Sequence, residues 1–156
     1  GEIGKYVSRT WAEVLDDFVL IEPKYKTRLT LTIPDYAAYN RNGDFSDLIN
    51  KDIYKKEGDI YNSRSWHYSY LFSNWGYGEI DNMLIENGNH ILLVYDSFSL
   101  VVAPFMALAS DKVILWDMRE NTDSIYEYID HNDVDIVIVA YTEGSSIAKE
   151  EMFNFR

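Results

Sequence analysis

The sequence predicts an α/β domain built on a parallel β-sheet. Three apolar segments, rich in aliphatic and β-branched residues, support this prediction: Ile91–Tyr95, Lys112–Trp116 and Val134–Tyr141. Such runs are typical of strands that are buried on both faces. Each is followed by a segment with helical character, and strands that alternate with helices form parallel sheets through right-handed crossovers.

The helical segments expected after the three strands are Leu100–Ala109, Ser124–His131 and Ser146–Phe153. In the second, Ile125 and Ile129 stand at helical spacing, which indicates one apolar face. No internal repeat or low-complexity linker interrupts the pattern.

The N-terminal half is less regular. Trp11–Phe18 predicts a short helix, whereas Phe18–Glu22 and Thr27–Ile33 have strand-like patterns. Asn40–Asp44 predicts a turn, and an irregular region rich in Tyr, Asn, Ser and Gly continues to about Gly78. We therefore expect one domain over residues 1–156, with an irregular part of strands and loops (1–87) and an α/β part that bears the serine (88–156).

Composition limits the functions open to this chain. Its 156 residues, 47% of them hydrophobic, suffice for one core. Fourteen basic residues against 26 acidic ones make it an acidic protein that repels nucleic acid. The chain lacks cysteine, which excludes thiol chemistry. We expect no metal and no cofactor, since no histidine pair has ligand spacing and no glycine-rich phosphate loop is present.

No apolar run reaches the length of a membrane span, because Asp96 and Pro104 interrupt the longest one. The sequence begins at Gly1 without a signal-type stretch, as an excised domain does. Any membrane attachment would therefore require segments outside this sequence.

Ligands of parallel α/β sheets bind at the carboxyl ends of the strands. Ser97 follows the first predicted strand, where its hydroxyl would lie near a helix N-terminus able to hold an oxyanion. The alternative is structural, because any of Asp96, Ser97 and Ser99 could cap the following helix. The same alternative applies to Ser145 and Ser146 after the third strand.

Three histidines are candidates for a base that activates a serine. His131 fits the C-terminus of a helix, and His90 precedes its strand, at the wrong end for catalysis. His67 lies in the irregular aromatic region and is the plausible base within the chain. In that region Trp66 and Trp75 could stack on sugar rings or belong to the core.

The order of these segments resembles a known superfamily. Ile91–Ser99, with Pro104-Phe105 after it, is similar to the nucleophile block of SGNH hydrolases, and Val113–Arg119 resembles the strand and Asp-x-Arg segment of the alginate O-acetyltransferase (AlgX/AlgJ) and DHHW families. The likeness extends over roughly residues 70–141 and implies a three-layer, flavodoxin-like fold that is incomplete at its N-terminus.

The resemblance also implies an activity. A serine, here Ser97, would take acetyl from a donor and pass it to a carbohydrate hydroxyl or to water, with its own backbone N–H as an oxyanion donor. Asp96 and Arg119 would be oxyanion- or substrate-binding residues, and Arg119 could hold an acidic sugar. A structural ion pair of Arg119 with Asp117 or Glu120 is the alternative. The implied partners are a polysaccharide and an acetyl donor, at an extracytoplasmic address in the cell envelope.

Two departures from the family pattern leave two hypotheses. Tyr95 replaces the usual glycine before Asp-Ser, which would crowd the oxyanion side, and no Asp-x-His motif precedes Ser97. The chain is therefore either part of an O-acetyltransferase or acetylesterase whose Asp and His lie outside it, or an inactive carbohydrate-binding or interaction domain. An incomplete sheet would also expose an edge that favours a homodimer.

Overall fold

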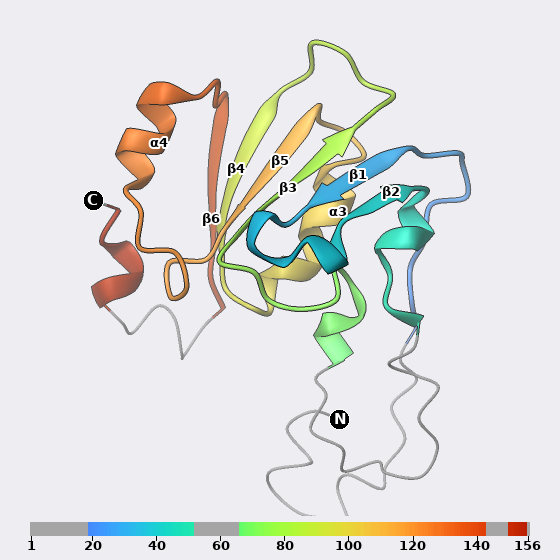
Figure 1. Ribbon diagram of the computed structural model, residues 1–156, viewed down its shortest axis with the longest axis horizontal. Coiled ribbons are helices and arrows are strands. Elements are labelled where there is room, and N and C mark those ends of the chain that lie inside the picture. The colour runs from blue at the N-terminus through green and yellow to red at the C-terminus, as the bar shows by residue number, and fades with distance from the viewer. Residues whose placement is uncertain (1–18, 52–65, 143–149, 156) are drawn as a thin grey trace, which may run out of the picture.

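The computed structural model describes residues 19–51, 66–142 and 150–155, and only the backbone of Trp66, His67 and Glu151. These residues build a six-stranded sheet in the order β2-β1-β3-β5-β4-β6, with helices on both faces (Figure 1). The strands are β1 (Leu29–Thr32), β2 (Arg41–Gly43), β3 (Tyr77–Asn82), β4 (His90–Tyr95), β5 (Lys112–Trp116) and β6 (Ile136–Ala140). The helices are the α-helices α3 (Ala103–Met106) and α4 (Ile125–His131) and the 3₁₀ helices η1 (Pro34–Tyr39), η2 (Phe45–Leu48), η4 (Trp66–Ser69), η5 (Ser99–Val102) and η6 (Glu150–Phe153).

The three predicted parallel strands are confirmed, but β6 lies at the edge of the sheet with exposed side chains and is not buried on both faces. β4 lies between β5 and β6 and is parallel to both, with Leu93 opposite Leu115 on one side and Ile138 on the other. Leu92 and Leu93 are both fully buried although they point to opposite faces, as expected for a central parallel strand. The α/β class and the layered arrangement expected from the sequence are therefore confirmed.

The other half of the sheet is antiparallel, and only one of its strands was predicted: β1 lies within the strand-like segment Thr27–Ile33. β3 pairs antiparallel with β5 on one side and with β1 on the other, and β1 pairs antiparallel with β2. β3 begins where the region expected to be irregular ends, and no strand was predicted over it. Buried and partly buried residues alternate along β3. The buried ones are Gly78, Ile80 and Asn82, so only one of them has an aliphatic side chain. The sheet is consequently mixed rather than parallel throughout.

Two further N-terminal predictions are corrected. The segment 40–44 is not a turn but contains edge strand β2, and the chain reverses earlier, in η1. Residues 19–22 form no strand, because the backbone of Ile21 bonds the Tyr70 hydroxyl through its N–H (2.9 Å) and its carbonyl (3.1 Å). The helix predicted over Trp11–Phe18 lies outside the described residues.

Among the described residues, helical structure is found at all three predicted places. Ser124 caps α4, its hydroxyl accepting a hydrogen bond from the N–H of Glu127 (3.2 Å). The segment expected over residues 100–109 divides into η5 and α3, with Pro104 in the first turn of α3. Of residues 146–153 the structure describes only η6. Within the described ranges, no helix has the length and apolar character to cross a bilayer.

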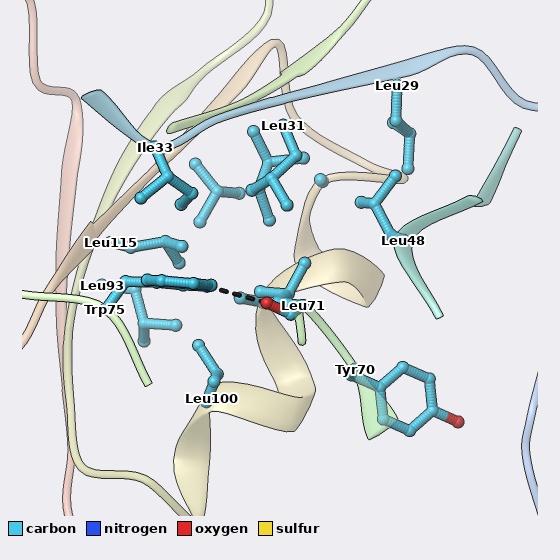
Figure 2. Close-up of a cluster of buried hydrophobic side chains, with 14 of the residues drawn as sticks. Leu29, Leu31, Ile33, Leu48, Tyr70, Leu71, Trp75, Leu93, Leu100 and Leu115 are labelled. Carbon is cyan, nitrogen blue, oxygen red and sulfur yellow. Dashed lines mark hydrogen bonds between the residues drawn. The ribbon is translucent and has the colours of Figure 1, made fainter. Parts of the chain in front are cut away.

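Side chains pack on both faces of the sheet. Figure 2 shows the larger cluster, in which Leu31, Leu93 and Leu115 from the sheet meet Leu100 from η5. The smaller cluster lies under α4, and its buried members are Leu92, Val94, Ile114, Trp116 and Ile125. α3 and α4 therefore cover opposite faces (Figure 1), which gives three layers.

A charged network crosses β3 and β5 on the α4 side. Lys112 Nζ contacts Glu79 Oε2 at 2.5 Å and Asp81 Oδ1 at 3.3 Å, and the Tyr77 hydroxyl donates to Glu79. Burial opposes the charge of both partners. The hydrogen bonds nevertheless hold the pKa of Glu79 below and that of Lys112 above its usual value. Both groups are thus ionised at neutral pH.

We expect Glu79→Gln to lower the free energy of unfolding by about 1 kcal/mol at pH 7. The folded-state pKa of Glu79 lies below its unfolded value, so the contribution is present above the unfolded pKa and disappears as the pH falls through the folded pKa. Urea unfolding of both proteins between pH 7 and pH 2 checks this. The exposed Glu86→Gln is the matched control, and an undiminished difference at pH 2 would refute the assignment.

Candidate active site

The candidate site lies at the edge of the sheet where β4, β5 and β6 end. Because these strands are parallel, the residues that follow them gather there. Asp96 follows β4, Asp117 follows β5, and Thr142 comes two residues after β6. Both carboxylates are buried, with exposures of 1% and 0%. Buried carboxylates need donors, so their partners define the site.

Asp96 joins the turn after β4 to the end of β6. Its Oδ1 accepts hydrogen bonds from the backbone N–H groups of Phe98 (3.2 Å) and Ser99 (3.1 Å). Its Oδ2 accepts from the N–H and the hydroxyl of Thr142, both at 2.6 Å. Of the residues proposed to cap the segment after β4, Asp96 is therefore the one that does so.

Ser97 lies at the tip of this turn and is partly exposed. Neither its hydroxyl nor its backbone N–H forms a hydrogen bond with any described residue. Asp96 supplies the capping that was the alternative role for Ser97. The turn thus presents a hydroxyl and a backbone donor that local structure does not use.

Asp117 fixes Arg119. Oδ1 of Asp117 accepts from the Arg119 backbone N–H and from Nε, both at 2.9 Å, and Oδ2 accepts from Nη2 at 2.5 Å. These hydrogen bonds raise the pKa of Arg119, with further support from the Asp96 charge. The Arg119 side chain keeps 33% exposure. The predicted ion pair therefore exists, with a buried partner, and part of the guanidinium stays accessible.

Asn74 is a member of the site that the sequence did not indicate. Its side-chain Nδ2 donates to Asp117 Oδ2, while its Oδ1 is buried without a hydrogen-bond partner. Asn74 precedes Trp75 in a loop between η4 and β3, and only the fold brings it to Asp117. No periodicity or motif in that loop marks it.

Tyr95 holds this loop and does not crowd Ser97. Its side chain is fully buried in the larger cluster, on the face where Leu93 lies. The hydroxyl accepts from the Trp75 N–H (3.1 Å) and donates to the Trp75 carbonyl. The expectation that Tyr95 obstructs the oxyanion side is thus corrected, because its ring points into the core.

The burial of Trp75 supports the expectation that it belongs to the core and not to a sugar-binding surface. The side chain is 4% exposed, and Nε1 donates to the Leu71 carbonyl at 2.7 Å (Figure 2). The rings of Tyr39 and Tyr36 pack against it at 4.8 and 5.4 Å between centroids. No ring face remains for a sugar. Trp66 and His67 lie in η4, and their side chains are outside the described residues.

The other histidines have structural contacts. His90 Nδ1 lies 2.8 Å from the Asp133 carbonyl oxygen, at the end of β4 opposite Ser97. His131 Nδ1 lies 2.7 Å from the Glu127 carbonyl oxygen within α4. These contacts agree with the structural role expected of His131 and with the expected position of His90 at the wrong end of its strand. In the part of the chain that the structure describes, no group of His, Asp and Glu could hold a metal ion.

Comparison with known proteins identifies the fold. No protein-family model matches the sequence, and no curated protein matches it either. Among solved structures, a DHHW family protein from Eubacterium siraeum matches 85% of this chain, with a TM-score of 0.60 and 12% identity. Bacillus cereus PatB1 matches 86% with a TM-score of 0.59 and 22% identity, and its structure with a sulfonyl adduct matches 86% with a TM-score of 0.61 and 19% identity.

These similarities show that the chain shares its α/β fold with the DHHW family protein and with PatB1, and at such identities they concern the fold alone. The chain spans about two fifths of each matched protein: 41% of the DHHW protein and 42% to 43% of PatB1. The resemblance of the sequence to the DHHW type is therefore matched at the level of the fold.

We expect Tyr95→Phe to destabilise the chain by about 1–3 kcal/mol, because the N–H and carbonyl of buried Trp75 lose their partner. Thermal or urea unfolding measures the loss. Tyr126→Phe, at a site 59% exposed, is the matched control and should change little. Equal stability of the two variants would show that the hydroxyl does not hold the loop.

Proposed function

We propose that this chain is the serine-bearing part of an SGNH-type carbohydrate O-acetyltransferase or acetylesterase, with Ser97 as its nucleophile. One observation carries the proposal: at the carboxyl edge of the sheet, the Ser97 hydroxyl and N–H form no hydrogen bond with any described residue, because Asp96 caps the turn. A nucleophile and an oxyanion donor are needed at one point for acyl transfer.

In the proposed reaction, Ser97 Oγ attacks the carbonyl carbon of an acetyl donor while a base accepts its proton. The oxyanion that forms is stabilised by the Ser97 N–H, and the exposed part of the Arg119 guanidinium adds positive charge. The bond to the donor's oxygen breaks, and that oxygen takes up the proton. A carbohydrate hydroxyl or water then attacks the acetyl-serine, which transfers the acetyl group and restores the Ser97 hydroxyl.

The base is the part of the proposal that the described residues do not supply. His90 and His131 are engaged elsewhere, so the base is either His67 or a histidine outside this sequence. The second option agrees with the chain spanning about two fifths of its structural neighbours. The Asp-x-His pair implied by the family resemblance would then lie in a segment that corresponds to the other three fifths of the neighbours' length.

The neighbours support the same chemistry. PatB1 has been solved with a sulfonyl adduct, and sulfonylation is a reaction of nucleophilic side chains. A glycan acceptor and an extracytoplasmic location belong to the proposal and follow from the family resemblance. The alternative is an inactive SGNH-like domain that binds glycans or proteins, and it is favoured by the lack of a base among the described side chains.

A fluorophosphonate probe tests the nucleophile. If the chain supplies its own base, we expect one adduct, seen by intact-protein mass, that Ser97→Ala abolishes and Ser99→Ala, in the same turn, retains. Loss of the adduct in His67→Ala would identify the base within the chain.

If this chain gives no adduct, the same experiment is made on a longer chain that contains an Asp-x-His motif. An adduct on Ser97 there would assign the base to the added segment. An unreactive Ser97 in both chains would overturn the enzymatic proposal and favour the binding domain.

A further inference from the structure

A separate cleft of about 540 Å³ opens between α4 and η1, at the start of β3 and the end of β5. Neither Ser97 nor Arg119 lines it. One wall is the segment 120–124, which directly follows Arg119 in the loop after β5. The cleft is therefore distinct from the turn that bears Ser97, yet it is built on the same loop as the guanidinium.

Aromatic rings form the floor of the cleft. Trp116 packs edge-to-face on Tyr128 and Tyr77, with centroids 5.1 and 6.0 Å away, and the two tyrosines lie 6.0 Å from each other. Tyr77 and Tyr128 are only partly buried, so they offer ring surface to a ligand. Aromatic surface of this kind packs against the apolar faces of sugar rings.

Trp116 also has an unused donor. Its side chain is 1% exposed, and its Nε1 is buried without a hydrogen-bond partner. Buried indole N–H groups almost always have an acceptor. Trp116 lines the cleft, so a small shift of the atoms that cover Nε1 would let an oxygen atom of a ligand supply that acceptor.

Charge restricts the ligand further. Four carboxylates line the cleft, those of Asp35, Glu120, Asp123 and Glu127, and no Lys or Arg among the described residues lines it. None of the four forms an ion pair with a described basic side chain. The cleft therefore disfavours uronic acids and phosphates and favours a ligand that brings positive charge.

We infer that the cleft binds a sugar unit that carries a protonated amine, such as an N-deacetylated hexosamine. The amine lies among the carboxylates, the sugar ring packs against Tyr77 and Tyr128, and a ring or hydroxyl oxygen accepts from Trp116 Nε1. This inference deepens the proposed function, on which its role as an acceptor subsite rests. It also opposes an acidic acceptor, the sugar class first considered for Arg119.

Calorimetric titration at pH 6 and low salt, with trimers of glucosamine, N-acetylglucosamine and galacturonic acid, tests the inference. We expect the glucosamine trimer to bind about tenfold more tightly than the N-acetylated trimer, because exposed charge pairs add modest attraction each. The galacturonic acid trimer should not bind. Equal or stronger binding of either competitor, or no binding of the glucosamine trimer, would overturn the inference.

Variants locate the site. The double variant Glu120→Gln, Glu127→Gln should lose most of the preference for the glucosamine trimer over the N-acetylated trimer. Glu86 is exposed and does not line the cleft, so Glu86→Gln should keep that preference. In ¹H–¹⁵N spectra the indole resonance of Trp116 should shift on titration. An unshifted Trp116 resonance, or an equal loss in Glu86→Gln, would place binding elsewhere and refute the inference.

The two proposals can fail independently. Binding in the cleft does not require the Ser97 hydroxyl, so Ser97→Ala should bind the glucosamine trimer like the unaltered chain. Binding without any reactive Ser97 would leave the cleft assignment standing and remove the acetyl-transfer role. A reactive Ser97 without binding would leave the acetyl-transfer proposal standing and refute the assignment of the cleft.

Discussion

The arrangement of the site depends on the hydrogen bonds of one buried carboxylate, Asp96. An ionised carboxyl at 1% exposure is tolerated only where several donors surround it, and Asp96 accepts at least four hydrogen bonds. Two donors come from the turn after β4 and two from Thr142, beyond β6. The burial of Asp96 therefore fixes the Ser97 turn relative to the edge strand β6, and no described residue bonds the Ser97 hydroxyl or N–H.

Asp117, at the end of the neighbouring strand β5, also positions other residues through hydrogen bonds. It orients Arg119 and binds Asn74. The loop that carries Asn74 is held in turn by the Tyr95 hydroxyl on Trp75. Burial and the two nearby carboxylate charges raise the pKa of Tyr141 to about 12, so it remains a neutral donor to the Met152 carbonyl (2.6 Å). The carboxylates of the edge are thus engaged in positioning, while the exposed carboxylates of the neighbouring cleft remain available to a cationic ligand.

The sequence predicted the elements whose signal is local. β4, β5 and β6 are continuous apolar runs, and Asp96 was among the residues considered for capping. β3 was missed because its alternation contains one aliphatic residue, and β2 because Asn42-Gly43 has the composition of a turn. Asn74 could not be predicted at all, since its link to Asp117 joins residues 43 positions apart. The burial of Trp75 likewise depends on tyrosines from another part of the chain.

The central claim, that Asp96 shapes the Ser97 turn and ties it to β6, is tested most directly by hydrogen exchange of individual amides in Asp96→Ala. The account predicts that the amides of Phe98 and Thr142 lose protection while that of Leu115, at the centre of the sheet, keeps it. Unchanged protection of these two amides would contradict the claim. So would an equal loss at Leu115, which would mean that Asp96 holds the whole sheet rather than its edge.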